Sequence, residues 1–219
     1  MEDAVAVLEV LRNDLESAME IEQVFQKHVV DGPSFFFLQA GQSQNDEYLL
    51  RHELAKACGA SINDVVIVGS AKMGFSVKNQ HFVGFDSKVM QTKLSRDRSD
   101  LDIAIINTRF FEQVAEQIYE MSRHFDKEWI HHYWQNNQYY CGEKNLFFEY
   151  TKSLAGGWLR PDYLPNVYLT SAEWIPPCTA WSAKLDRKVA VGLFSNWTYL
   201  KHYHMDHLEI LRAKLQTLV

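Results

Sequence analysis

The chain has 219 residues, of which 47% are hydrophobic and 13% aromatic, so it is long and apolar enough to form a sizeable core and is atypical of a disordered protein. Its formal net charge of -6 argues against a generally basic nucleic-acid-binding protein, although a local basic patch is not excluded. Cys58, Cys141 and Cys178 lie far apart and follow no zinc or disulfide spacing, which fits a reducing compartment.

The N-terminal segment is acidic and amphipathic, unlike a signal peptide, and no apolar run approaches the roughly 20 residues that span a bilayer. We therefore expect a cytoplasmic protein without a membrane segment.

Hydrophobic periodicity and turn residues predict the elements of the first half of the chain. These are one long helix or two over residues 3–30, a short strand or buried turn over 35–41, a helix over 45–59 and a fully buried strand over 62–70. Asn45 or Asp46 is the expected N-cap of the helix, and Gly59 the residue that ends it.

The second half continues the alternation of strands and helices. The predicted elements are a polar connection with a short helix over residues 71–98, a strand over 99–107, a helix over 108–125 capped by Thr108, a helical region over 126–150, a loop over 156–166, a third strand over 187–194 and a closing helix over 196–219. This pattern predicts a single domain, residues 1–219, of the α/β (α+β) class, with a helical N-terminal region over 1–58.

Two aspartates interrupt the second apolar strand, which reads Ser-Asp-Leu-Asp-Ile-Ala-Ile-Ile. Asp100 and Asp102 flank one residue, so both side chains point to the same face of the strand. Like charges held this close repel unless a cation lies between them, and Mg²⁺ prefers such oxygen ligands. Because the strand is otherwise continuously apolar, we expect a metal site rather than two ordinary surface aspartates.

The first strand ends in Gly69-Ser70, followed closely by Lys72. Glycine lets the backbone approach a phosphate, a serine hydroxyl can donate to a phosphoryl oxygen, and the lysine adds charge. The Gly-Ser-Ala-Lys-Met-Gly spacing is not that of a Walker loop. A Gly-Ser turn alone is commonplace, and its specificity comes from the Ser-Asp-Leu-Asp strand that follows.

Together the two segments resemble the signature of the polymerase-β-like nucleotidyltransferases, in which a hydrophobic strand, Gly-Ser and a short connection precede an acid-hydrophobic-acid strand. The likeness covers residues 62–107 and looks nearest to bacterial antiviral-defence and abortive-infection members. It implies a small mixed sheet flanked by helices, Gly69 and Ser70 as the triphosphate-holding pair, and Asp100 and Asp102 as ligands of Mg²⁺ or Mn²⁺.

The resemblance also implies a third acid on a later strand. The strand over residues 187–194 contains none, so Asp186, directly before it, is the first candidate for a third catalytic carboxylate, and Glu149 and Glu173 are weaker ones. Asp186 is equally compatible with a surface position beside Arg187. Some members of the superfamily manage with two carboxylates.

The function implied is template-independent transfer of a nucleoside monophosphate from a nucleoside triphosphate, such as ATP, to a hydroxyl of a nucleotide, an oligonucleotide or a protein side chain, in antiphage defence. Alternatives are a toxin that modifies tRNA and a nucleotide sensor without catalysis. The partners expected are the nucleoside triphosphate, a short nucleic acid or tRNA acceptor, an effector protein of a defence operon, and further copies of the chain.

Several other residues have two alternative roles. Arg160 can clamp phosphates or pair with Asp162, Lys188 can bind phosphate or belong to a solvated face, and Arg98 can hold a phosphate or offset the carboxylates. The histidines, including His204 and His207, complete no zinc pattern and are expected to be surface or packing residues. Most aromatic residues should be in the core, with one or two available to stack on a base.

Overall fold

The computed structural model of the chain describes residues 2–39, 41–78, 81–136 and 144–217. Its centre is a four-stranded sheet in the order β1-β4-β6-β5, accompanied by the two-stranded hairpin β2-β3. The strands are β1 (Val65–Val68), β2 (Phe75–Lys78), β3 (His81–Gly84), β4 (Leu101–Ile106), β5 (Trp158–Leu159) and β6 (Val189–Phe194). The chain is therefore a mixed α and β protein, as the sequence predicts.

The central strand β4 is antiparallel to β1 and parallel to β6. The register aligns Val68 with Asp102 on one side and Asp102 with Ala190 on the other. The short β5 pairs only with the last two residues of β6, so the first residues of β6 have no β5 partner. The four-stranded sheet is thus mixed, with one parallel and two antiparallel pairs of strands.

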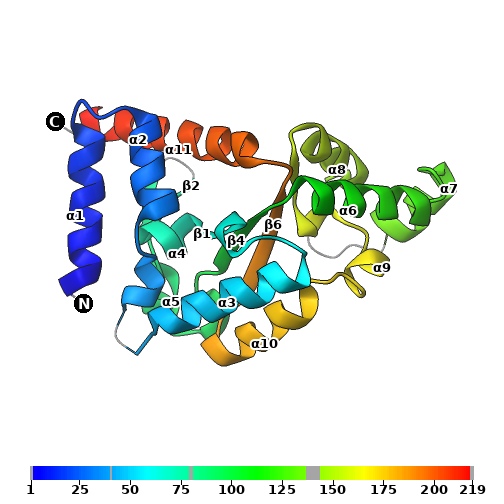
Figure 1. Cartoon of the computed structure of the whole chain (residues 1–219), viewed down its shortest axis with the longest axis horizontal. Coiled ribbons are helices and arrows are strands. Elements are labelled where there is room, and N and C mark those ends of the chain that lie inside the picture. The colour runs from blue at the N-terminus through cyan, green and yellow to red at the C-terminus, as the bar shows by residue number, and fades with distance from the viewer. Residues whose placement is uncertain (1, 40, 79–80, 137–143, 218–219) are drawn as a thin grey trace.

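Helices surround the sheet (Figure 1). The α-helices are α1 (Glu2–Glu16), α2 (Ile21–Phe25), α3 (Gln44–Ala57), α4 (Gly69–Met73), α5 (Ser87–Thr92), α6 (Thr108–Met121), α7 (Lys127–Trp129), α8 (Leu146–Ala155), α9 (Asn166–Leu169), α10 (Ile175–Leu185) and α11 (Trp197–Thr217). Shorter or irregular helical segments are η1 (Gln26–Asp31), η2 (Phe35–Leu38), η3 (Ile62–Asp64), η4 (Ser95–Asp97), η5 (Ile130–Gln135) and η6 (Pro161–Tyr163).

Alternation along β4 separates two hydrophobic cores. Leu101, Ile103 and Ile105 point into a core formed with α3, α6, α8 and α10, whereas Ala104 and Ile106 point into a second core with α1, α2 and α11. Both faces of the sheet are thus covered by helices, which explains why β1 and β4 are continuously apolar.

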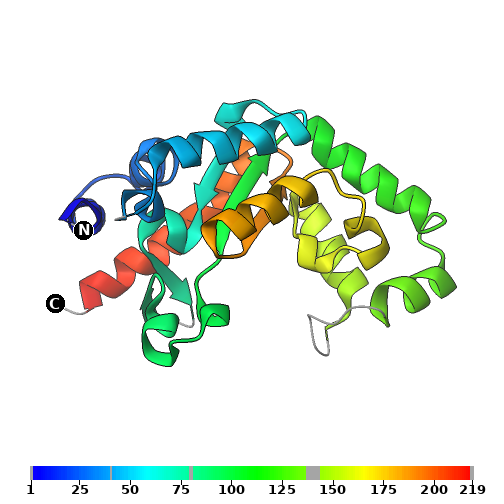
Figure 2. The ribbon, with the colours of Figure 1, turned by 90° about the horizontal axis from the view of Figure 1, so that it is seen from below.

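Helices α6 to α9 extend to one side of the sheet and give the molecule an arched outline (Figure 2). An aromatic cluster stabilises this part of the molecule, the segment from α6 to α9. Trp134 is fully buried, and its ring centre lies 4.8 Å from that of Tyr150 and 5.2 Å from that of Phe147. The indole N–H of Trp134 donates a hydrogen bond to Tyr163 O. The segment from α6 to α9 contains the helical region expected over residues 126–150, of which residues 137–143 lie outside the described part.

Several predicted details are wrong by one or two residues. Ser43, not Asn45 or Asp46, caps α3, because its hydroxyl accepts a hydrogen bond from Asn45 N. Asn107 caps α6 through Phe110 N, and Thr108 is the first helical residue. Gly59 is confirmed as the residue after the end of α3, with a positive φ of 60° that suits a helix C-terminus.

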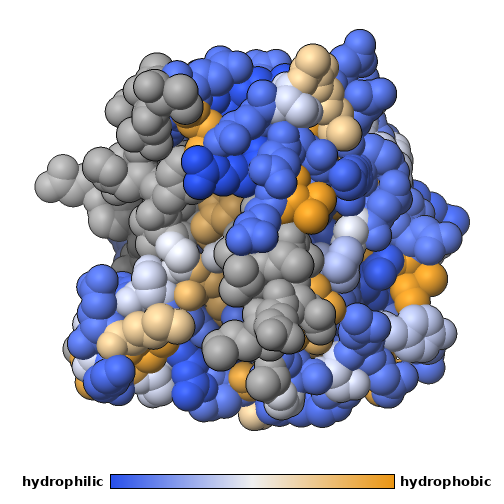
Figure 3. Space-filling view, turned by 90° about the vertical axis from the view of Figure 1, so that its left-hand side faces the viewer, coloured by the Kyte–Doolittle hydropathy of each residue, from blue (hydrophilic) through white to orange (hydrophobic). Residues whose placement is uncertain are grey.

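Three elements depart from the predicted ones. The connection over residues 71–98 contains the hairpin β2-β3 as well as α4 and α5, the predicted loop over 156–166 contains the strand β5, and α10 was not predicted. None of the described helices is long and apolar enough to cross a bilayer. The residues that are not grey in the view of Figure 3 are mainly hydrophilic, with scattered apolar ones.

Candidate functional site

A cleft of about 710 Å³ lies at the end of the sheet where β1 ends and β4 and β6 begin. Six of the eight predicted site residues line it: Gly69, Ser70, Asp100, Asp102, Arg160 and Lys188. Two segments separated by about thirty residues in the sequence thus line one cleft.

Small side chains open this cleft on the face of the sheet that carries Asp102. Ala190 and Gly192 of β6 occupy the positions beside Asp102 and Ala104. Because side chains of paired residues share a face, only a methyl group and a hydrogen atom fill the space next to the aspartate. At the other end of the same face, α11 covers Ala104 and Ile106 and closes the core.

Gly69 connects the two parts of the motif directly. Its φ of +66° is favourable only for glycine among the common residues, and a Cβ built on it would lie 3.1 Å from Oδ2 of Asp102. The Asp102 carboxylate therefore lies against the backbone of the Gly-Ser turn. Helix α4, which begins at Gly69, has only five residues, so that the turn itself and the Ser70 hydroxyl, rather than a helix dipole, are the groups available to a phosphate.

Asp100 lies directly before β4, at the mouth of the cleft. Its carboxylate is 42% exposed, and Oδ2 is 3.4 Å from Nζ of Lys188, which belongs to the segment before β6. Lys188 O in turn accepts a hydrogen bond of 2.8 Å from Leu101 N, which fixes the two strand starts side by side.

A buried ion pair positions the segment that carries the aspartates. Arg187 Nη1 and Nη2 donate to the carboxylate of Asp86 at 3.3 and 3.0 Å, and Arg187 Nη1 also donates to Ser99 O at 2.8 Å. Ser99 N donates to Asp86 Oδ1 at 2.8 Å, and Asp86 N donates to Ser99 Oγ at 3.0 Å. Ser99, the residue before Asp100, is therefore hydrogen-bonded through both its backbone N–H and its backbone C=O. This network could not be predicted, because Asp86 and Ser99 are 101 and 88 residues away from Arg187 in the sequence.

Aromatic side chains form the opposite wall of the cleft. Trp158 lies across Gly192, where a Cβ would come within 3.0 Å of its Nε1, and its ring is 5.8 Å from that of Phe194 at an interplanar angle of 10°. The Tyr203 ring is 4.7 Å from Trp158 and 6.1 Å from Phe194. His204 follows on α11 and also lines the cleft. His204 was expected to be a surface or packing residue, and the sequence does not distinguish Trp158, Phe194 and Tyr203 from the other aromatic residues.

Burial sets the protonation of the two residues from α11. It lowers the pKa of His204 to about 4, with a further contribution from His207, so that the imidazole is neutral at pH 7. Burial also raises the pKa of Tyr203, with Arg160 acting in the opposite direction and Asp102 in the same one. His204 is 6% exposed, and its Nε2 has no hydrogen-bond partner in the described structure. The wall of the cleft therefore contains a buried imidazole nitrogen to which a ligand could form a hydrogen bond.

Asp100 and Asp102 offer carboxylate oxygens of the type that Mg²⁺ or Mn²⁺ prefers. The donor set fits a hard divalent ion whose remaining ligands would be water and substrate oxygens. Over the described residues, no group of three or more His, Cys, Asp and Glu side chains is gathered so as to hold a metal ion. A third carboxylate is thus not found beside this pair.

Lys72 and Asp186 do not line the cleft. Lys72 is 4% exposed and donates a hydrogen bond to Gly32 O on the far side of α4. Asp186 ends α10 with a side chain that is 75% exposed and pairs with Arg98. Asp186 therefore has the surface position that was its alternative assignment, and it is not among the residues that line the cleft with Asp102. Glu149 and Glu173 are not among the residues that line the cleft either.

Arg160 and Arg98 line the cleft and also pair with acids. Arg160 Nε and Nη2 lie 3.0 and 2.9 Å from Oδ2 of Asp162, and its guanidinium lies over the Tyr163 ring at 5.3 Å. Of the two roles expected for Arg160, the pair with Asp162 is observed. Because Arg160 also lines the cleft, its guanidinium can contact a ligand there as well. Arg98, for its part, donates through Nη1 to Asp186 O at 2.7 Å and also pairs with the Asp186 carboxylate.

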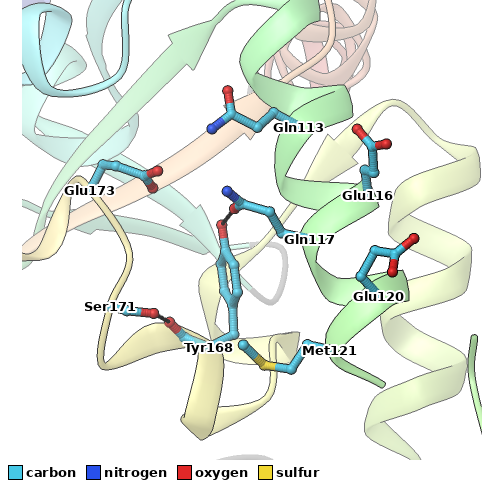
Figure 4. Close-up of a pocket in the computed structure, with 8 residues that line it drawn as sticks. All are labelled: Gln113, Glu116, Gln117, Glu120, Met121, Tyr168, Ser171 and Glu173. Carbon is cyan, nitrogen blue, oxygen red and sulfur yellow. Dashed lines mark hydrogen bonds between the residues drawn. The ribbon is translucent and has the colours of Figure 1, made fainter. Parts of the chain in front are cut away.

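A second hollow of about 610 Å³ lies between α6 and the segment around α9 (Figure 4). Its walls contain Glu116 and Glu120 of α6 together with Glu173, and the Tyr168 hydroxyl donates to Oε1 of Gln117 at 2.9 Å. None of the motif residues lines it. Its acidic walls are unsuited to the phosphates of a nucleotide, so the cleft at the sheet is the better candidate site.

The described cysteines are not reactive groups. Burial raises the pKa of the Cys58 and Cys178 thiols to about 12, and both are free. Such thiols stay protonated and behave as small apolar side chains. Cys141 lies outside the described residues.

Comparison with known proteins adds no relative: no protein-family model, no curated protein and no solved structure matches this chain.

Proposed function

We propose that the chain is a metal-dependent, template-independent nucleotidyltransferase that transfers a nucleoside monophosphate from a nucleoside triphosphate to a hydroxyl group. The observation that carries the proposal is the contact between the two parts of the motif, in which the Asp102 carboxylate lies 3.1 Å from the Cβ position of Gly69 in a common cleft. Phosphates on the Gly-Ser turn would then lie beside the carboxylates.

The proposed transfer uses the carboxylates of the cleft and a divalent ion bound to them. A divalent ion on Asp100 and Asp102 would neutralise the charge of the phosphates. The acceptor oxygen attacks the α-phosphorus, the bond from that phosphorus to the bridging oxygen breaks, and pyrophosphate leaves with the electron pair. The proton of the hydroxyl passes to water, because no third carboxylate of the described cleft is free to receive it.

The aromatic wall supports a nucleoside as the ligand. Trp158 and Tyr203 present ring surfaces to the cleft, and stacking of a base on such a ring contributes about 1–3 kcal/mol. The neutral His204 can either donate or accept a hydrogen bond at Nε2, depending on its tautomer. The acceptor hydroxyl belongs to a nucleotide, an oligonucleotide or a protein side chain, and the role in antiphage defence, with an effector protein as partner, belongs to the same proposal.

The test is incubation of the protein with each radiolabelled NTP and dNTP in Mg²⁺ or Mn²⁺, followed by separation of the products. We expect a labelled product and pyrophosphate from the wild type and neither from Asp100→Asn/Asp102→Asn. Asp206→Asn, an exposed change on α11, is the matched control and should keep full activity. Products that survive in the double variant would contradict the proposal.

A nucleotide sensor of the same fold is the second candidate, favoured by the alanine that stands beside Asp102 on β6. This candidate predicts metal-dependent binding of a nucleotide without any product from the eight nucleotides. A variant with His204→Leu distinguishes specific binding from adsorption, since it should weaken nucleotide binding in either case.

A further inference from the structure

The strand next to Asp102 has no acidic side chain. The parallel register pairs Asp102 with Ala190, and paired residues of adjacent strands place their side chains on the same face. β6 reads Val-Ala-Val-Gly-Leu-Phe, so Ala190 is the position from which a carboxylate would reach the space beside Asp102. Ala190 lines the cleft, which means that this space is open rather than filled by the core.

A positive charge stands on the same face two residues earlier. Lys188 precedes Ala190 by two positions, and alternation places both side chains on one side. Lys188 Nζ is 3.4 Å from Oδ2 of Asp100. An ammonium group has three donors and no acceptor, so it can neutralise the carboxylate but cannot bind a metal ion.

The other acids that line the cleft are held by cations of their own. Asp97 Oδ1 is 2.8 Å from Lys88 Nζ, and Asp162 Oδ2 is 2.9 Å from Arg160 Nη2. In the part of the chain that the structure describes, no third acidic or imidazole ligand converges with Asp100 and Asp102. The geometry therefore offers one pair of carboxylates with an ammonium on its flank.

We propose that this site holds a single divalent cation on Asp100 and Asp102, and that the Lys188 ammonium supplies the second positive charge to the phosphates of the bound nucleotide. The ligand class rests on the proposed function, whereas the number of ions rests on the residues of β4 and β6 alone. When phosphate binds, Lys188 exchanges its contact with Asp100 for one with a phosphoryl oxygen, and the carboxylate becomes available to the ion.

Electron paramagnetic resonance of Mn²⁺ counts the ions without any need for turnover. The full chain is titrated with Mn²⁺ in the presence of an ATP analogue with a methylene bridge between the α- and β-phosphorus atoms, which cannot release pyrophosphate. After subtraction of the ions bound by the analogue alone, we expect one Mn²⁺ per chain and none in Asp100→Asn/Asp102→Asn. Two ions per wild-type chain would overturn the inference.

Two substitutions of Ala190 form a matched pair of variants that test this position. Ala190→Asp places a carboxylate beside Asp102 and should add a second Mn²⁺, whereas Ala190→Asn, of the same shape without the charge, should leave the count at one. A folded Ala190→Asp that still binds one ion would contradict the assignment of this position. Circular dichroism and thermal unfolding of both variants establish that they are folded.

Lys188→Met tests the ammonium separately. It should weaken binding of the ATP analogue about tenfold, the effect of one charge-assisted contact of about 1.4 kcal/mol. In the absence of nucleotide it should tighten Mn²⁺ binding, because it removes the cation beside Asp100. Unchanged analogue affinity would contradict the role of Lys188.

The outcomes separate this inference from the proposed function. One Mn²⁺ per chain without transfer of any nucleotide supports the inference and contradicts the nucleotidyltransferase. Two Mn²⁺ ions per chain together with nucleotide transfer support the nucleotidyltransferase and contradict the inference. The absence of any Mn²⁺ binding contradicts both.

Discussion

Gly69 is the residue on which the geometry of the cleft depends most closely. It combines a positive φ with a close approach to the Asp102 carboxylate, two constraints that a side chain cannot meet together. Its role therefore differs from that of a glycine that only turns the chain.

We predict that Gly69→Ala loses about 1–2 kcal/mol of unfolding free energy from backbone strain and also weakens Mn²⁺ binding, because the Asp102 carboxylate must move away from the new methyl group. Gly59→Ala is the control, since Gly59 has a φ of +60° but no atom within 4 Å of its Cβ position. Chemical denaturation and Mn²⁺ titration of both variants check this. Equal loss of metal affinity in the two variants would show that strain alone is responsible.

Lys72 belongs to the Gly-Ser segment, but its buried side chain binds Gly32 O and does not line the cleft. Burial lowers its pKa to about 8, with Glu47 raising and Arg51 lowering the value further. The lysine of an unfolded chain has a pKa of about 10.4, so between pH 8 and 10 the unfolded chain binds more protons than the folded one. The free energy of unfolding contributed by Lys72 must therefore rise with pH in that window.

We expect this rise to amount to about 2 kcal/mol between pH 8 and 10, and to be missing from Lys72→Met, which has no proton to lose. Urea denaturation of both proteins at a series of pH values measures the difference, in which the titration of other groups cancels. Parallel curves for the two proteins would mean that the lysine is not buried as described.

At the scale of elements, the pair of Arg187 and Asp86 joins the turn after the β2-β3 hairpin to the start of β6. The Arg187 side chain is 7% and the Asp86 side chain 15% exposed, and the guanidinium lies 4.4 Å from the Phe36 ring centre. Such a pair is costly to break, because removal of one partner leaves a buried charge.

Arg187→Lys should accordingly lower the unfolding free energy by about 2 kcal/mol or more, because a lysine cannot donate to Asp86 and Ser99 at once. It should also weaken Mn²⁺ binding, since Ser99 precedes Asp100. Arg12→Lys, in an exposed pair with Glu16 on α1, is the control and should change stability by less than about 0.5 kcal/mol. Thermal unfolding and Mn²⁺ titration distinguish the two. Full metal affinity in a destabilised Arg187→Lys would restrict the network to a structural role.

The elements with strong local signals were predictable. β1 and β4 are continuous β-branched and aliphatic runs, and α6 and α11 show helical periodicity, so each was placed within a few residues. The missed elements have weak or misleading signals. α10 begins with Ile175-Pro176-Pro177, which looks like a loop, although proline is tolerated in the first turn of a helix. β5 has two residues, too few for any period.

The site was predictable where it is local in sequence and not where it is built by tertiary contacts. Gly69, Ser70, Asp100 and Asp102 belong to two short segments and line one cleft. The third acid could not be located, because the partner of Asp102 depends on the register of β6, which places Ala190 there. The orientation of Lys72 depends likewise on how α4 packs against the segment around Gly32.

On the scale of the whole molecule, the first and last described helices are joined over the sheet. Arg212 of α11 donates through Nε to Leu15 O at 2.9 Å and through Nη2 to Met19 O at 2.6 Å. Leu11 and Leu15 of α1 share their core with Leu208 and Leu211 of α11. The face of the sheet that carries the cleft is therefore completed by segments from both ends of the described chain.

Arg212→Met removes both donors while keeping an apolar stem, and we predict that it increases amide hydrogen exchange at the end of α1 and in α2 without affecting β4. Glu209→Gln, an exposed change on the same helix, should leave exchange unchanged throughout. Mass spectrometry of peptides from both variants reports the difference. Exchange that rises equally in β4 would indicate global destabilisation instead.

The contact between α1 and α11 also determines when this core can be completed during synthesis of the chain. The contact of Arg212 with Leu15 joins residues 197 positions apart, a separation that a ribosome covers in roughly 10–40 s at about 5–20 residues per second. During that interval only α1 and α2 are available to cover Val66, Val68 and Ala104, and the part of this core that α11 contributes is missing. Because the same helix brings Tyr203 and His204 to the wall of the cleft, that wall is complete only after α11 has left the ribosome.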